Sequence, residues 1–360
     1  MKAAVLHQVG DTKLEVRDDV QPIPTPADSV RVKIHATGVC HSDLHAMTGM
    51  VPQTMPAVLG HEGAGEIVEV GANVTDIAVG DHVIVNWLPS CGACKTCLQG
   101  KPYLCMVYVM KSFTEANFTA GDSPYFGMAG TGTFAEEVVL PRAGVVKIPN
   151  DVPYDVASLI GCGVMTGVGS VINTAKVKPG STVLVIGCGG VGTSVIQGAR
   201  IAGASFIVAV DMLDKKLEWA KQFGATHAVK PDDLPAVMGE LTEWGGFDYT
   251  FDVVARSSTI RQAYDNTARG GTMTIVGVGA ATDMAQFSAF ELLFSDRTIL
   301  GSVYGSGHPA RDFPRLIALW KAGRLDLEGM ITRRIGIDDI NDAFDTMQSG
   351  EVIRQVIEFA

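Results

Sequence analysis

Hydrophobic residues follow one pattern over the first 150 residues and a different one after about Tyr154. In the first part, apolar and polar residues alternate over short runs such as VRVKIHA at residues 30–36, and glycine or proline separates the runs. Alternation with a period of two is typical of half-buried β-strands. The runs GAGEIVEVG, DHVIVNW and TFAEEVVL have the same character. We therefore expect residues up to about 150 to form a small, mostly antiparallel β-barrel, with Pro22, Pro24 and Pro26 in a stiff connector.

From about Tyr154, short apolar runs alternate with helical segments. TVLVI, FIVAV, FDYTFDVV and TMTIVGVG are the apolar runs, and LDKKLEWAKQF is one of the helices between them. Strands that alternate with helices predict βαβ units and a parallel sheet. After about Tyr304 the regularity fades, and the helices DFPRLIALWKAG and IDDINDAFDTMQ precede a last strand, VIRQVIEF. The expected fold class is therefore α/β, with a doubly wound parallel sheet beside the barrel.

The length and charge of the chain exclude several classes of protein. With 360 residues and 38.0 kDa, the chain suits two domains, each large enough for its own core. Its net charge is −11 and no Lys/Arg cluster is present, so nucleic acid is not an expected partner. No apolar run reaches the roughly 18 residues that cross a bilayer, and MKAAVLHQVG does not resemble a signal peptide. Seven cysteines without an export signal favour the reducing cytoplasm.

Four of the seven cysteines fall within one short stretch, CGACKTCLQGKPYLC. Cys91, Cys94, Cys97 and Cys105 have the spacing C-x2-C-x2-C-x7-C, which matches a closed tetrahedral zinc site. The alternative is a group of buried or disulfide-paired cysteines in a loop. Because four protein ligands leave no position for a substrate, this zinc is expected to be structural. The chemistry must therefore lie elsewhere in the chain.

A glycine-rich turn follows the strand TVLVI. Gly187, Gly189 and Gly192 form the pattern G-x-G-x-x-G, which opens a helix and lets backbone N–H groups approach a pyrophosphate. The next strand, FIVAV, ends at Asp211, where an acidic residue is expected to bind the adenosine ribose hydroxyls. A carboxylate there repels a 2′-phosphate. The predicted cofactor is therefore NAD rather than NADP.

Four other residues are assigned to the same cofactor site. Lys216, one helical turn beyond Asp211, could reach the ribose, although it could equally be an exposed helix lysine. Gly190 and Val191 lie within the glycine-rich turn, and Val278 lies in the run TMTIVGVG. Cys188, inside the turn, is interpreted as a small packed residue without a ligand role.

A second group of metal-type side chains comes from GVCHSDLHAMTG, GHEG and GCGVMTG. Its members are Cys40, His41, Asp43, His45, His61, Glu62 and Cys162. Two thiolates, an imidazole and an exchangeable water form a known open catalytic zinc site. Singly, each Cys or His could be a packed or solvated residue, and the spacing alone does not select the ligands.

Taken together, these motifs closely resemble the zinc-dependent medium-chain alcohol dehydrogenases, from Met1 to the end of the chain. The resemblance implies a GroES-like catalytic domain at residues 1–163 and 304–360, with a structural-zinc lobe near residues 91–105. A Rossmann domain at residues 164–303 interrupts it in sequence, and the active site is expected in the cleft between them.

The resemblance also implies roles for the second group. Cys40, His61 and Cys162 match the ligands of the catalytic zinc. Glu62 resembles a carboxylate beside the metal, and Asp43 the carboxylate that orients the His61 ring.

Further roles follow from the same resemblance. His41 and Arg354 match basic groups near the pyrophosphate. Ser42 and His45 match a relay that carries the alcohol proton to solvent. The alternatives are a helix N-cap for Ser42 and a plain exposed histidine for His45.

Two positions bear on the substrate. Trp87 corresponds to a position that walls the substrate pocket, where a large ring favours primary alcohols, aliphatic or benzylic; the alternative is a core aromatic. Members that act on glutathione adducts usually carry an arginine four residues after the last structural cysteine, where this chain has Val109. The segment 106–130 matches little else of the family.

The expected function is the reversible oxidation of an alcohol to an aldehyde or ketone, with hydride transfer to NAD and two zinc ions per chain. Other interpretations are a nicotinoprotein that keeps NAD bound and uses another electron acceptor, a glutathione-dependent formaldehyde dehydrogenase, or an NAD-sensing zinc protein without turnover. The expected partners are a small-molecule substrate and further copies of the chain, as a homodimer or homotetramer.

Overall fold

The computed structural model describes residues 1–360, which divide into two compact units. The first unit contains Met1–Cys162, His308–Ala322 and Leu327–Ala360. The second contains Gly163–Gly307 and Gly323–Asp326. The chain passes from the first unit to the second after residue 162 and returns after residue 307. The boundaries expected from the sequence lie after residues 163 and 303.

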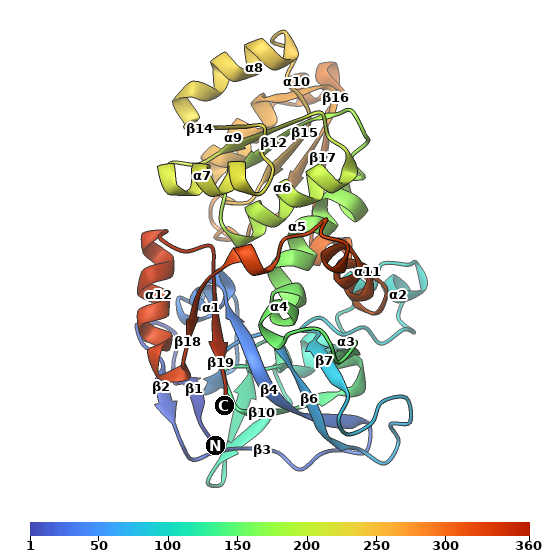
Figure 1. Cartoon of the computed structure of the whole chain (residues 1–360), viewed down its shortest axis with the longest axis vertical. Helices are drawn as coiled ribbons and strands as arrows, with labels where there is room; N and C mark the ends of the chain where they lie inside the picture. Colours follow the sequence, from blue (N-terminus) through green and yellow to red (C-terminus); the bar gives the residue numbers. More distant parts are fainter. The chain divides into compact units, whose positions relative to one another are not determined.

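The first unit is built on a seven-stranded sheet with the order β11-β7-β6-β4-β19-β18, in which β10 also pairs with β4 (Figure 1). Its strands are β4 (Ser29–Val39), β6 (Glu62–Val70), β7 (His82–Val85), β10 (Glu137–Pro141), β11 (Val145–Lys147), β18 (Ile331–Ile335) and β19 (Arg354–Glu358). On β4, Val30, Val32 and Ile34 are buried in the core, while the polar residues between them are partly exposed. The predicted alternation is thus seen directly.

A smaller sheet completes the barrel-like unit, with the order β2-β1-β5-β9-β8-β3. Its strands are β1 (Ala3–Leu6), β2 (Glu15–Arg17), β3 (Val20–Pro22), β5 (Ala57–Val58), β8 (Phe118–Ala120) and β9 (Ser123–Gly127). The α-helices of the unit are α1 (His41–Met47), α2 (Lys95–Leu98), α3 (Val107–Lys111), α4 (Tyr154–Leu159), α11 (Pro309–Lys321) and α12 (Ile340–Ser349). Pro22 ends strand β3, so the expected proline connector is shorter than predicted.

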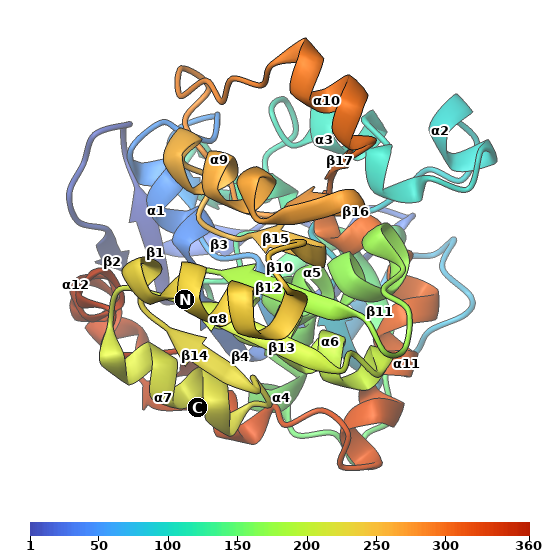
Figure 2. The ribbon, with the colours of Figure 1, turned by 90° about the horizontal axis from the view of Figure 1, so that it is seen from above.

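The second unit is a six-stranded parallel sheet with the order β14-β13-β12-β15-β16-β17 (Figure 2). Its strands are β12 (Thr182–Ile186), β13 (Phe206–Val210), β14 (His227–Val229), β15 (Phe247–Asp252), β16 (Thr267–Ile275) and β17 (Thr298–Gly301). Numbered along the chain, this order is the 3-2-1-4-5-6 arrangement of a Rossmann fold. The predicted doubly wound parallel sheet is confirmed.

Helices cover both faces of this sheet. They are α5 (Met165–Gly169), α6 (Gly190–Ala202), α7 (Asp214–Gln222), α8 (Leu234–Thr242), α9 (Ser257–Asp265) and α10 (Ala289–Ser295). Apolar residues of α6 and α7 share one core cluster with the sheet, and those of α8 and α9 share the other. A parallel sheet buried on both faces explains the continuous apolar runs of its strands.

A continuous helical stretch, Tyr154–Ala175, is long and apolar enough to cross a membrane, contrary to the expectation from the sequence. Its most apolar window is 83% buried inside the protein, as in the core helix of a globular protein. The stretch contains two π-helical segments, Ile160–Val164 and Ser170–Ala175. Cys162 lies in the first of them, and π-helical turns often occur at functional sites.

Candidate active site and metal centres

Four metal-type side chains converge inside the first unit. The ligand atoms of Cys40, His61, Glu62 and Cys162 all lie within 4.8 Å of one another, and all four residues are buried. Nε2 of His61 and Oε1 of Glu62 make no hydrogen bond. A buried polar atom without a partner costs about 1–3 kcal/mol. The donor set therefore fits a metal ion, and two thiols with an imidazole suit zinc.

Each ligand is placed by a different piece of backbone. Cys40 directly follows strand β4 and is the N-cap of helix α1. His61 directly precedes strand β6, Glu62 is the first residue of that strand, and Cys162 lies in the π-helical segment after α4. The thiol of Cys162, with help from His61 and against the effect of burial, lowers the pKa of Cys40 well below its ordinary value. The site thus favours the thiolate, which is the metal-binding form.

Asp43 fixes two of these ligands. Its side chain is fully buried; Oδ2 accepts a hydrogen bond from the Cys40 N–H at 3.0 Å, and Oδ1 lies 3.3 Å from Nδ1 of His61. Oδ1 also accepts from the Gly60 N–H at 3.0 Å. Burial disfavours a charge on His61, but Asp43 and Cys40 outweigh it and raise the pKa of His61 to about 10. With Nδ1 turned toward Asp43, Nε2 is left for the metal.

Arg354 is paired with Glu62 rather than exposed. It begins strand β19, its side chain is 6% exposed, and its guanidinium contacts the Glu62 carboxylate directly. A Cβ atom at Gly38 would collide with both groups, so glycine is needed on the neighbouring strand. The sequence places Arg354 near a pyrophosphate but does not reveal this ion pair, because its partners lie 292 residues apart.

The two relay candidates lie on helix α1. Sγ of Cys40 lies 3.7 Å from Oγ of Ser42. Cys40, not Ser42, is the N-cap, so the alternative interpretation of Ser42 is wrong. His45 is half-buried, its Nδ1 makes no hydrogen bond, and burial lowers its pKa. It is therefore not the plain exposed histidine of the alternative, whereas His41 is exposed.

Trp87 follows strand β7 and stands beside the metal cluster. Its ring meets the His61 ring edge-on, with centroids 6.2 Å apart and planes at 84°. The side chain is only partly buried, unlike that of a core aromatic.

The cysteine quartet forms a second centre. The Sγ atoms of Cys91, Cys94, Cys97 and Cys105 lie within 4.8 Å of one another, and none forms a disulfide. The backbone N–H of Cys94 donates to Sγ of Cys91, and that of Cys91 donates to Sγ of Cys105, each at 3.3 Å. The predicted four-thiol structural zinc site is thus present, and the disulfide alternative is wrong.

The glycine-rich turn lies in the second unit, between β12 and α6. Gly187 has φ +94°, a left-handed value that favours glycine, and a Cβ at Gly192 would collide with the Gly187 carbonyl. Asp211 accepts hydrogen bonds from the Cys188 N–H at 2.9 Å and the Leu213 N–H at 3.1 Å. Its carboxylate thereby joins the turn to the end of β13.

The remaining cofactor candidates are accessible, and Cys188 is not. Gly190, Val191 and Lys216 are partly exposed, and Val278 is 50% exposed. Cys188 is fully buried, which raises the pKa of its thiol, in agreement with a packed residue.

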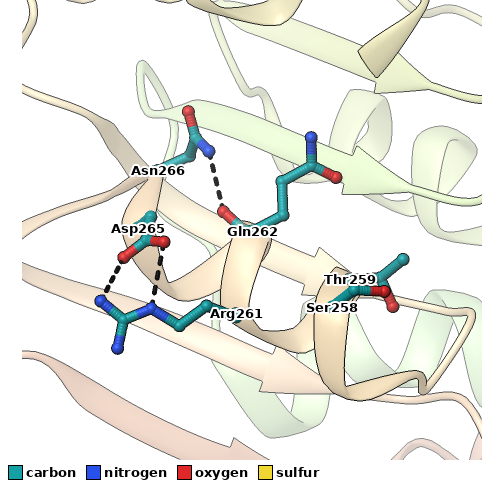
Figure 3. A pocket seen from close by; sticks show the side chains of 6 residues that line it. All are labelled: Ser258, Thr259, Arg261, Gln262, Asp265 and Asn266. Carbon is teal, nitrogen blue, oxygen red and sulfur yellow. Dashed lines mark hydrogen bonds and ion pairs between the residues drawn. The ribbon is translucent and has the colours of Figure 1, made fainter. Parts of the chain in front are cut away.

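A surface pocket elsewhere in the second unit contains none of these residues. It lies along helix α9 and is lined by Ser258, Thr259, Arg261, Gln262, Asp265 and Asn266 (Figure 3). Its one cation, Arg261, is already paired with Asp265 at 2.7 Å and with Glu291 at 3.0 Å. No charge or unpaired ligand atom in this pocket suggests chemistry.

Two family models match the chain. "Alcohol dehydrogenase GroES-like domain" matches residues 26–150, and "Zinc-binding dehydrogenase" matches residues 190–322. An alcohol dehydrogenase class-3 of Cereibacter sphaeroides is 39% identical, over 92% of this chain and 93% of the relative. An S-(hydroxymethyl)glutathione dehydrogenase of Paracoccus denitrificans is 38% identical, over 99% of each.

A solved structure, the benzyl alcohol dehydrogenase from Acinetobacter calcoaceticus, superposes with a TM-score of 0.93 at 34% identity, over 100% of this chain and 99% of that one. The fold, the ligand cluster and these matches together define a dehydrogenase. The chain belongs to the zinc-dependent medium-chain alcohol dehydrogenase family. The prediction of an NAD-dependent zinc oxidoreductase that acts on small-molecule alcohols is confirmed.

Proposed function

We propose that this enzyme oxidises primary alcohols, benzylic or aliphatic, at a zinc held by Cys40, His61 and Cys162. The observation that carries this proposal is the buried ligand cluster with the Trp87 ring edge-on to His61. A wide ring at that position narrows the space beside the metal. A primary alcohol, with one substituent on the carbinol carbon, therefore fits more readily than a secondary alcohol, with two. The benzyl alcohol dehydrogenase to which the chain is similar supports the benzylic choice.

When bound, zinc lowers the pKa of a coordinated hydroxyl as a Lewis acid, and NAD accepts the hydride. The chain's own residues prepare this chemistry. Asp43 orients His61 and fixes the Cys40 backbone. Arg354 neutralises the Glu62 carboxylate and fixes its position by an ion pair. Cys40, His61 and Cys162 would then hold the zinc, and three protein ligands would leave a position for the alcohol, as in other catalytic zinc sites.

The alcohol proton must leave a buried site, and helix α1 offers a route. The Ser42 hydroxyl, beside Cys40, both accepts and donates a hydrogen bond. His45, almost one turn further on, has a ring nitrogen without a partner and can exchange protons near neutral pH. We assign the first transfer to Ser42 and the release toward solvent to His45.

The cofactor site proposed in the second unit consists of the glycine-rich turn and Asp211, with the accessible residues Lys216 and Val278. His41 is exposed at the start of helix α1, and we assign it a contact with a phosphate of the cofactor. Arg354 is buried on Glu62, so its proposed contact with the pyrophosphate requires its remaining N–H groups. NAD is preferred over NADP because the Asp211 carboxylate repels a 2′-phosphate.

We further propose a cytoplasmic homodimer or homotetramer. None of the seven cysteines forms a disulfide, which suits a reducing compartment. Helix α10 exposes Phe290 and Leu293 by 70% and 74%, next to the unpaired edge strand β17. An exposed apolar patch beside a free sheet edge supports self-association.

A glutathione-dependent activity is the second candidate, because a curated relative is an S-(hydroxymethyl)glutathione dehydrogenase. Val109 stands against it, since a valine on helix α3 cannot bind the carboxylates of glutathione. An assay of formaldehyde with and without glutathione separates the candidates. Activity that depends on glutathione would replace the first proposal.

The main test is a panel of primary and secondary alcohols with NAD, followed by the ultraviolet absorbance of the reduced cofactor. We expect primary benzylic or aliphatic alcohols to give the highest kcat/KM, and Trp87→Ala to shift the preference toward secondary alcohols. Trp320→Ala is the matched control. Trp320 on helix α11 is also partly exposed, but its indole N–H donates a hydrogen bond to Glu328. The same panel with dialysed enzyme and no added NAD tests the nicotinoprotein interpretation. An unchanged preference in Trp87→Ala would contradict the role of Trp87.

A further inference from the structure

Tyr154 lies between two histidine rings at the start of helix α4. The His35 ring stacks on it with centroids 4.4 Å apart and planes at 16°. The His82 ring lies 4.5 Å from it, tilted by 34°. Nε2 of His35 and Nδ1 of His82 are buried and make no hydrogen bond. The three rings, named here the ring stack, therefore hold together by contact rather than by polar bonds.

The ring stack and the metal cluster are joined by the same strands. His35 lies on β4, five residues before Cys40. Glu66 pairs with His82 across strands β6 and β7, and it lies four residues after Glu62 on β6. Because β4 and β6 are antiparallel neighbours, the ring stack lies near the middle of these strands and the ligands lie at one end of them.

Helix α4 makes the third connection. Tyr154 is its first residue, and the helical stretch continues into the π-helical segment that carries Cys162. Eight residues of helix span about 12 Å, so a shift of the helix start is passed to the ligand. The next residue, Asp155, forms an ion pair with Arg334 at 2.6 Å. The Arg334 side chain is 46% exposed. Such a pair contributes little by itself. At the helix start the ring stack adds aromatic contacts to the buried Val156 and Ala157.

We propose that Tyr154 is a positioning residue for Cys162, and that the ring stack makes retention of the catalytic zinc sensitive to protonation of His35. This inference rests on the proposed role of Cys162 as a ligand of that zinc.

The charges around the ring stack give the direction of the pH effect. Burial lowers the pKa of His35, and Lys33 and His82 lower it further, against an opposite effect of Glu66, whose carboxylate lies 4.0 Å from Nε2. Beside His82 on the chain, Asp81 is already neutralised by Lys147 at 2.7 Å. The folded protein therefore favours the neutral form of His35.

The sign follows from linkage. A base with a lowered folded pKa stabilises the fold above its unfolded pKa of about 6.5, and this stabilisation is lost as the pH falls below that value. Mild acid should therefore loosen α4 and release zinc.

The first test measures zinc release to a chromogenic chelator near neutral pH, with alkylation of the freed thiols located by peptide mass spectrometry. Tyr154→Ala should release one zinc about tenfold faster than wild type, with alkylation at Cys162, since a change of about 1.4 kcal/mol is a factor of ten. Tyr154→Phe keeps the ring and should behave like wild type. Tyr125→Ala, which removes the same type of side chain from the barrel core, controls for general destabilisation.

The second test uses His35→Phe, which keeps an aromatic ring but cannot be protonated. When the pH falls from about 7.5 to about 5.5, the rate of zinc release should rise in both proteins. The factor by which it rises should be about ten times larger for wild type than for this variant. Equal pH profiles for the two proteins, or equal release from Tyr154→Ala and Tyr125→Ala, would overturn the inference. If zinc fails to protect Cys162 in wild type, the ligand assignment itself is wrong, which is a separate outcome.

Discussion

The ion pair between Glu62 and Arg354 offers the sharpest test of the metal site. Glu62 is fully buried and Arg354 is 6% exposed, so neither charge is solvated by water. Removing one partner leaves the other as an unpaired buried charge. We expect Arg354→Met and Glu62→Gln each to destabilise the first unit by about 3–5 kcal/mol. Arg354→Met also frees Glu62 to approach the zinc, and it should therefore reduce turnover.

The magnitude of the coupling follows from the direct contact of the two groups. Two unit charges at about 4 Å interact by about 4 kcal/mol at the effective dielectric constant of about 20 that reproduces measurements in proteins. The double variant, Glu62→Gln with Arg354→Met, lacks both charges. It should be more stable than the sum of the single changes suggests, by about 3–4 kcal/mol.

The assay is urea unfolding of the four proteins at equal zinc content, followed by tryptophan fluorescence and by circular dichroism. The exposed pair of Lys111, the last residue of helix α3, with Glu115 in the following turn, at 3.1 Å, is the control pair. A cycle there should give about 0.2–1 kcal/mol. A coupling for Glu62 and Arg354 that is as small as the control would refute the reasoning, because it would mean that water reaches both charges.

Three further changes test the other parts of the site. Cys94→Ser should lower the zinc content from two ions per chain to one and reduce the unfolding midpoint, since a structural zinc contributes folding free energy; metal analysis that finds one zinc in wild type contradicts this. Asp211→Ser should reduce kcat/KM with NAD by about 10–100-fold, as for the loss of charge-assisted hydrogen bonds, and improve the use of NADP; equal use of both cofactors by wild type speaks against it. Ser42→Ala should reduce turnover about 10²-fold. His45→Gln should reduce turnover less and mainly remove the acidic limb of the pH–rate profile. This limb should lie below the ordinary histidine pKa, because burial lowers the pKa of His45. Near-normal turnover of folded Ser42→Ala rules out the relay.

Features with a local cause could be predicted from the sequence. The cysteine quartet is encoded within fifteen residues, so its spacing alone indicated a metal site, and the structure brings all four thiols together. Strand β4 and the Rossmann strands have long periodic or apolar runs, and they lie where these runs predict them. Strands such as β5 (Ala57–Val58) and β8 (Phe118–Ala120) are too short to show a period. The segment 106–130, which the sequence left without an assignment, contains two strands, β8 and β9.

Features with a non-local cause could not be predicted from spacing. Cys40, His61 and Cys162 meet only after β4, β6 and the helix after α4 are packed, so selecting them from seven candidates required the family resemblance. The π-helical turn at Cys162 has no sequence signal, since its residues also suit an ordinary helix. The ring stack of Tyr154 is likewise formed by three separate elements.

The two buried carboxylates of the site differ in what they can still bind, and this separates their roles. Asp43 faces three donors, the N–H groups of Cys40 and Gly60 and the ring of His61, so both of its oxygens are engaged. Glu62 has the Arg354 guanidinium on one oxygen and no partner on the other, within 4.8 Å of the thiol and imidazole ligands. Asp43 therefore serves as a fixed support, whereas Glu62 is the carboxylate that a metal ion can recruit. As ligand types the two residues are equivalent in the sequence, and only their hydrogen-bond partners distinguish the support from the reserve ligand.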